Sequence, residues 1–65
     1  MNKIRIGSLL YWLSDDFIWI VLEIPTEAKS SYNMYCVNTG LFCSEYSGTN
    51  MITAISQHYA EILYE

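Results

Sequence analysis

The feature that most constrains the fold is a run of apolar residues at positions 17–24, interrupted only by Glu23 and followed by Pro25. Most of its eight residues are aromatic or β-branched, the types that favour extended backbone. Pro25 cannot donate a hydrogen bond to a neighbouring strand, so a strand must end there. The sequence therefore predicts one long strand, with its partners in the shorter apolar segments around it.

Turn signals divide the rest of the chain into short pieces. Residues 3–6 alternate polar and apolar and end at Gly7, and residues 9–13 form a short apolar run closed by a polar turn at 14–16. A hairpin turn is expected at Gly40, because glycine adopts a positive φ without steric cost. The expected elements are strands at 3–6, 17–24, 32–37, 41–46 and 60–64, and a helix or 3₁₀ turn at 51–58.

The short helix is expected to be capped by Thr49 or Asn50, whose side chains can accept hydrogen bonds from free backbone N–H groups. Ile52, Ile55 and Tyr59 have helical spacing and are expected to form its apolar face.

The hairpin at Gly40 has two candidate registers. A two-residue loop pairs Cys36 with Cys43, whereas a three-residue loop with Gly40 as the bulge pairs Cys36 with Phe42 and sends the cysteines to opposite faces. The residues before Gly40 suit a type I turn, so we expect the second register. Two cysteines do not form the disulfide framework of a small secreted protein, and both are expected to be buried as small apolar side chains.

Length and charge narrow the range of functions. The 65 residues suffice for a single domain, 1–65, and the formal net charge is −4. No lysine or arginine follows Ser30, so direct binding to nucleic acid is disfavoured, because that affinity depends on basic residues. No stretch approaches the roughly 20 apolar residues of a membrane span. We expect a cytoplasmic protein with an acidic surface that suits a basic protein partner.

The two faces of the strand at 17–24 are both apolar, although a strand at the surface normally has one polar face. The isoleucine-rich face is expected to be the core face, and it consists of Ile18, Ile20, Leu22 and Ile24. The other face is then either covered by a neighbouring strand or exposed as an aromatic patch, the kind of surface that marks a partner contact. The expected partner-binding residues are Trp19, Phe17, Tyr11 and Trp12. The acidic residues Asp15, Asp16 and Glu45 are expected to attract a basic surface of the partner.

The order of these pieces resembles that of SH3-like small β-barrels. The resemblance rests on residues 6–10, 18–24, 35–40 and 55–63, which match a glycine-led first strand, a long second strand, a third strand with its hairpin, and a closing helical turn with the last strand. It implies a mostly β, five-stranded SH3-like barrel with a short helix or 3₁₀ turn before the last strand. Short proteins of tailed bacteriophages are similar in this way, which implies a virus-encoded protein in the host cytoplasm.

The residues indicate no enzyme, cofactor or metal. Cys36, Cys43 and His58 lack the spacing of a zinc site, and nothing places His58 beside a thiol as a catalytic base. The main hypothesis is a non-enzymatic protein-interaction module that binds or inhibits a host protein. The alternatives are an acidic mimic of nucleic acid that blocks a DNA-binding host protein, and a structural homo-oligomer in a virion or another assembly. A homodimer is a further option for the partner.

Overall fold

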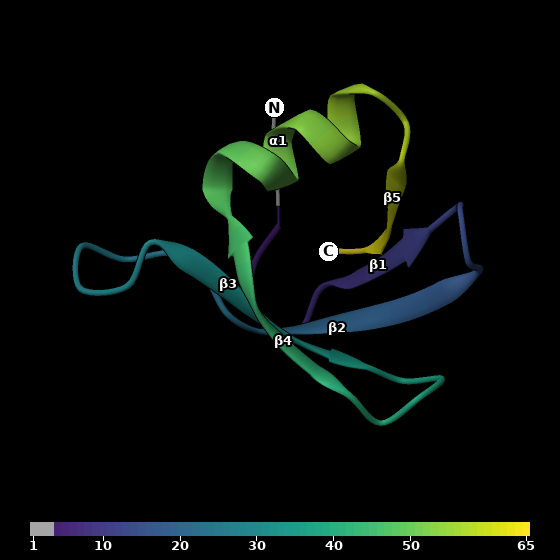
Figure 1. Cartoon of the computed structure of the whole chain (residues 1–65), viewed down its shortest axis with the longest axis horizontal. Helices are drawn as coiled ribbons and strands as arrows, with labels where there is room; N and C mark the ends of the chain where they lie inside the picture. The colour runs from purple at the N-terminus through teal and green to yellow at the C-terminus, as the bar shows by residue number, and fades with distance from the viewer. Residues whose placement is uncertain (1–3) are drawn as a thin grey trace.

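The structure is a computed structural model that describes residues 4–65, and it contains one antiparallel sheet and one helix (Figure 1). The elements in chain order are β1 (Leu9–Trp12), β2 (Phe17–Glu23), β3 (Ser31–Cys36), β4 (Phe42–Ser47), α1 (Gly48–Ser56) and β5 (Ala60–Tyr64). The prediction of a mostly β domain with five strands and a short helix before the last strand is confirmed.

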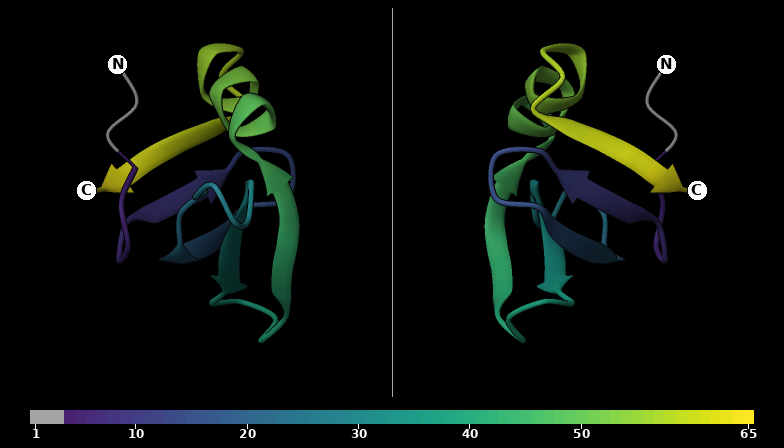
Figure 2. Two further views of the ribbon diagram at one scale, coloured as in Figure 1. Left: turned by 90° about the vertical axis from the view of Figure 1, so that its left-hand side faces the viewer. Right: turned by 90° about the vertical axis from the view of Figure 1, so that its right-hand side faces the viewer.

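The five strands lie in the order β4-β3-β2-β1-β5, so the two edges of the sheet are β4 and β5. The helix α1 joins these edge strands and packs against both of them, lying across one end of the twisted sheet (Figure 2). Within residues 4–65 the edges do not pair with each other, so the sheet is not closed into a barrel.

The core lies between the sheet and α1, on what we call the inner face. It is built from Leu10, Val21, Met34 and Met51, each at most 2% exposed, and from Tyr32 at 5%. Leu10 and Val21 come from neighbouring strands, and Val21 is paired with Met34 across the β2–β3 ladder. Because paired residues share a face, this pairing fixes which side of β2 is buried.

The expectation that the isoleucine-rich side of β2 forms the core is therefore wrong. Ile18 and Ile20 lie on the opposite, outer face, while Leu22 and Ile24 are 36% and 38% exposed. An apolar strand with two apolar faces does not show by itself which one is buried. The choice depends on which sides of β1 and β3 meet α1, and these are the sides that carry Leu10 and Met34.

The expected strand at 3–6 does not form. Lys3 lies outside the described residues, and residues 4–8 have no strand structure. The first strand is instead the apolar run after Gly7, whose φ of 94° turns the chain before β1. Gly7 donates its backbone N–H to the carbonyl of Val21 at 2.8 Å, which ties this entry segment to β2.

The hairpin between β3 and β4 adopts neither expected register. Tyr35 pairs with Phe42 and Met34 with Cys43, and Cys36 donates its N–H to the carbonyl of Leu41 at 2.8 Å, so the loop contains residues 37–40. A loop with one more residue than expected returns Cys43 to the same face as Cys36. The prediction that the cysteines lie on opposite faces is wrong, although Gly40 does have the expected positive φ, 77°.

The helix begins earlier than expected. Ser47 is its N-cap, and its Oγ accepts the backbone N–H of Asn50 at 3.1 Å. Because the helix starts at Gly48, the buried face carries Met51 and Ala54, whereas Ile52 is 57% exposed. The helix ends with His58 in the left-handed region, φ 62°.

Candidate protein-interaction surfaces

The residues expected to bind a partner lie on both faces of the sheet and do not form one patch. The register pairs Trp12 with Phe17 and Leu10 with Trp19, so these three aromatic side chains share the inner face with the core. Tyr11 pairs with Ile18 and lies on the outer face. Glu45 is exposed on the edge strand β4.

The outer face carries an apolar row that crosses all five strands. Each residue of the row is paired with the next in the ladder, in the order Tyr64, Leu9, Ile20, Tyr35 and Phe42. No element of residues 4–65 lies over this face, because α1 packs on the other side (Figure 1). We call this set the outer row.

The two ends of the outer row are its most exposed part. Phe42 and Tyr64, on the two edge strands, are each 68% exposed, while the three central residues are half-buried by their neighbours. The ring of Phe42 contacts that of Tyr35 with a centroid distance of 5.0 Å and a tilt of 57°. Apolar surface that continues across a sheet is often functional when it is large, so the outer row is a candidate interaction surface.

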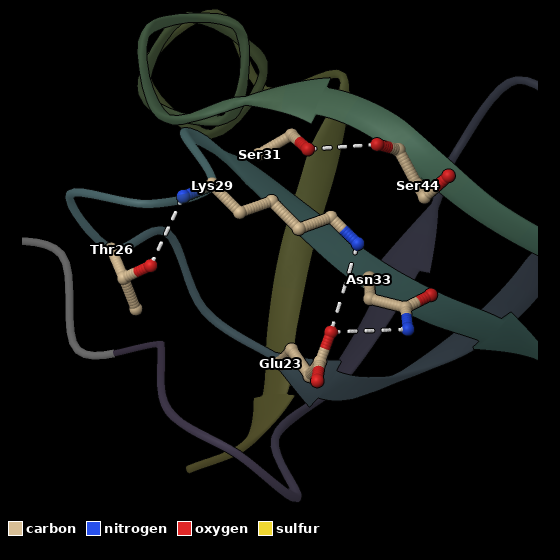
Figure 3. A network of polar contacts seen from close by, with 6 residues as sticks. All are labelled: Glu23, Thr26, Lys29, Ser31, Asn33 and Ser44. Atoms are coloured by element: carbon tan, nitrogen blue, oxygen red, sulfur yellow. Dashed lines mark hydrogen bonds and ion pairs between the residues drawn. The ribbon is translucent and has the colours of Figure 1, made fainter.

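One end of the outer face is bordered by a polar network (Figure 3). Glu23 pairs with Lys29 at 3.7 Å and accepts a hydrogen bond from the amide of Asn33 at 3.4 Å. The Lys29 backbone N–H donates to Thr26 Oγ1 at 3.2 Å, which holds the β2–β3 loop around the ion pair. The pair neutralises Glu23, while Glu27 in the same loop is exposed.

The opposite end of the outer face is acidic. The hydroxyl of Tyr11 donates a hydrogen bond to the carboxylate of Asp16, and Glu61 lies directly opposite Tyr11 on β5. The hydrogen bond to Asp16, partial burial and the nearby carboxylates raise the pKa of Tyr11 above its ordinary value. Asp16 has a φ of 59°, a conformation that Asp tolerates in turns.

Beside the core cluster, the inner face contains an open pocket of about 140 Å³ whose floor includes the core residue Met34. We call it the aromatic pocket, and it is lined by Trp12, Asp15, Trp19, Met34, Cys43 and Tyr46. The rings of Trp12 and Tyr46 meet edge to face, with centroids 5.2 Å apart and planes at 84°. Burial, and to a smaller extent the nearby Cys43, raises the pKa of the Tyr46 hydroxyl.

The two thiols differ in access. Cys36 is fully buried, whereas Cys43 is partly exposed in the aromatic pocket, and neither is in a disulfide. Burial raises the pKa of the Cys36 thiol, but hydrogen bonds from Thr39 and Asn38 outweigh it, and the net direction is downward. The lack of access still prevents reaction in the folded state.

Among residues 4–65, no three His, Cys, Asp or Glu side chains are grouped so that they could hold a metal ion. The helix α1 has nine residues, and the described part of the chain contains no helix of the length and apolarity needed to cross a bilayer. In comparisons with protein-family models, curated proteins and solved structures, no match to this chain was found.

Sequence reasoning missed the outer row and the part that Tyr46 plays in the pocket. The individual residues were visible as apolar or aromatic, but their alignment across the strands depends on the register of four ladders. Three of these ladders carry register shifts close to the row, between Leu9 and Leu10, between Val21 and Glu23, and between Tyr32 and Met34. Such shifts cannot be read from the residue pattern alone.

Proposed function

We propose that the chain is a non-enzymatic protein-interaction module that binds another protein through the outer row. The observation that carries the proposal is a continuous apolar row across five strands with no element over it. Aromatic residues are the types most often responsible for binding energy at protein interfaces, and both ends of the row are aromatic.

The charges around the outer row favour a basic partner. Asp16 and Glu61 border one end, where no ion pair forms within residues 4–65, and Lys29 at the other end is already paired with Glu23. A partner with an apolar patch ringed by lysine or arginine would match both features and would associate faster because of its charge. A second copy of this chain also carries a net charge of −4, so charge repulsion opposes self-association through the outer row.

The SH3-like class and the viral setting belong to the same proposal. The order of the elements, with the helix between β4 and β5, supports an SH3-like arrangement whose sheet remains open. The resemblance to short bacteriophage proteins supports a virus-encoded accessory protein that binds or inhibits a protein in the host cytoplasm. This part of the proposal depends on the resemblance alone.

The test compares two exposed apolar positions. Phe42→Ser removes one end of the outer row, and Ile52→Ser removes an apolar side chain of similar exposure on α1, away from the row. Both variants should remain folded by circular dichroism. A partner captured by the wild-type chain should bind the Ile52→Ser variant normally and the Phe42→Ser variant about 30-fold more weakly, as for an interface hot spot.

Three results would contradict the proposal. Equal binding by both variants would place the interface elsewhere. Affinity that falls by several orders of magnitude between low and moderate salt would favour the nucleic-acid mimic, since such a complex depends mainly on charge. Self-association that is abolished by Phe42→Ser, measured by sedimentation, would favour the homo-oligomer.

A further inference from the structure

The aromatic pocket lies on the other side of the sheet from the outer row, and its chemistry is that of a cation site. Trp12 and Tyr46 form two walls at 84°, and Trp19 on the neighbouring strand adds a third ring. Aromatic faces carry negative electrostatic potential and attract cations, most strongly where water is excluded. Three rings around one small space are therefore suited to a positively charged group.

Among residues 4–65, Asp15 supplies the one charged group that lines this pocket. One of its carboxylate oxygens accepts the backbone N–H of Phe17 at 3.2 Å, which holds the side chain at the start of β2 beside the pocket. Of the residues that the structure describes, no lysine or arginine lines the pocket, and Lys29 is engaged by Glu23. The pocket thus combines a carboxylate with aromatic walls and has no cation of its own.

The size and lining of the pocket narrow the type of cation. About 140 Å³ is less than half of the roughly 300–1,000 Å³ of a typical small-molecule site, so it suits a single head group. A primary ammonium has three N–H donors that all need acceptors once water is excluded. Apart from Asp15 and the Tyr46 hydroxyl, the pocket is lined by rings and by the sulfur atoms of Met34 and Cys43, which accept hydrogen bonds only weakly, so a primary ammonium would lack a full set of acceptors there.

We propose that the aromatic pocket binds a quaternary alkylammonium group, whose methyl groups contact the rings while Asp15 faces its charge. Such a group occurs at the end of a trimethylated lysine side chain and in choline. The site is independent of the outer row, so either proposal can fail without the other.

Tryptophan fluorescence tests this directly, because the two tryptophans of the chain, Trp12 and Trp19, both line the pocket. The probes are tetramethylammonium, Nα-acetyl-trimethyl-lysine amide, choline and 3,3-dimethylbutanol, the neutral carbon analogue of choline. Saturable changes are expected with the three cations, and about 5- to 30-fold weaker binding with the neutral analogue. Equal affinity for choline and its neutral analogue, or no saturation with any cation, would overturn the proposal.

The two cationic ligands of biological origin distinguish the sources. Tighter binding of the lysine derivative than of choline would assign the site to a modified protein, and the reverse order would assign it to a choline-bearing molecule. Either order supports the quaternary ammonium, provided that the neutral analogue binds more weakly.

Adjacent acidic residues provide a matched pair of variants. Asp15→Asn keeps an oxygen that can accept the Phe17 N–H but removes the charge at the pocket, whereas Asp16→Asn removes the neighbouring charge outside its lining. Affinity for tetramethylammonium should fall about fivefold in the first variant and stay unchanged in the second. Equal losses in both would indicate a diffuse acidic surface and would overturn the proposed role of Asp15.

Cys43 gives a second readout that does not depend on fluorescence. It is partly exposed in the pocket, whereas Cys36 is fully buried, so iodoacetamide should modify only Cys43 in the folded chain. Saturating tetramethylammonium should slow this modification severalfold. An unchanged rate at a concentration that saturates the fluorescence change would place the cation outside the pocket.

Discussion

Leu9 and Leu10 are adjacent leucines in one strand that occupy opposite environments. Leu10 is fully buried under α1, and Leu9 is half-buried in the outer row. The difference follows from the alternation of side chains along a strand, which sends successive residues to opposite faces. The pair therefore reports which face of the sheet is the core.

Leu10→Ala should lower the free energy of unfolding by about 2–5 kcal/mol, because it leaves a cavity among well-packed side chains. Leu9→Ala removes the same atoms from a site that solvent already reaches, and it should cost distinctly less. Urea denaturation of both variants measures the difference. Equal losses would mean that the outer face is packed as tightly as the inner one, contrary to the structure.

The Tyr11–Asp16 hydrogen bond gives a defined pH dependence. The raised pKa of Tyr11 means that the folded chain retains the phenolic proton more tightly than the unfolded chain does. Its contribution to stability is complete below the ordinary pKa of 10.0 and is lost as the pH rises through the higher pKa of the folded state. Tyr11→Phe should therefore show a shallower loss of stability above pH 10 than the wild type.

Thermal denaturation across the alkaline range checks this expectation. Asp16→Asn, which removes the charge of the acceptor, should show the same shallower slope as Tyr11→Phe. A wild-type slope in both variants would show that the hydrogen bond contributes nothing to the pH dependence.

At the scale of elements, the sequence predicted the number and order of strands better than their faces. The strands at 17–24 and 60–64 were predictable because aromatic and β-branched residues mark them and Pro25 ends the first. The sequence predicts a later start of the helix, because Thr49 and Asn50 are good caps in isolation. In the structure Ser47, the last residue of β4, is the N-cap instead. Register and helix start together decide which residues are buried, so the candidate site was predicted only in part.

The helix ends with a motif that usually contains glycine. Tyr59 donates its N–H to the carbonyl of Ala54 at 2.8 Å, and His58 donates to Ile55 at 3.1 Å, the two bonds of a Schellman ending. His58 holds the left-handed position at φ 62°, where a β-carbon is unfavourable.

His58→Gly should raise the free energy of unfolding by about 0.5–1 kcal/mol, because the relief of the left-handed strain exceeds the added freedom of the unfolded chain. His58→Ala keeps a β-carbon and serves as the control, with no gain expected. Thermal denaturation distinguishes the two. A stabilisation of similar size in both would assign the effect to the imidazole side chain rather than to the backbone.

At the scale of the whole molecule, the sheet has two apolar faces but only one helix to cover them. Within the described residues, α1 is the one helix, and it covers the inner face. The closed barrel expected from the sequence would have buried one apolar face inside. In the open sheet α1 covers that inner face, and the outer row stays at the surface, as the outer face of a closed barrel would.

Solubility should therefore depend strongly on pH. The isoelectric point is about 4.6, and near that pH the mutual repulsion of the chains disappears while the outer row remains apolar. We expect a deep solubility minimum there, which Phe42→Ser makes shallower and Ile52→Ser leaves largely unchanged. Light scattering against pH measures it, and equal curves for the two variants would exclude the outer row as the cause.

Under the proposed function, the unshielded outer row also links the abundance of this protein to that of the partner that covers it. Free copies present the type of surface that chaperones and proteases recognise, and bound copies do not. Synthesis in excess of the binding partner should then lead to degradation of the surplus, so that the steady-state amount follows the supply of the partner and not the rate of translation.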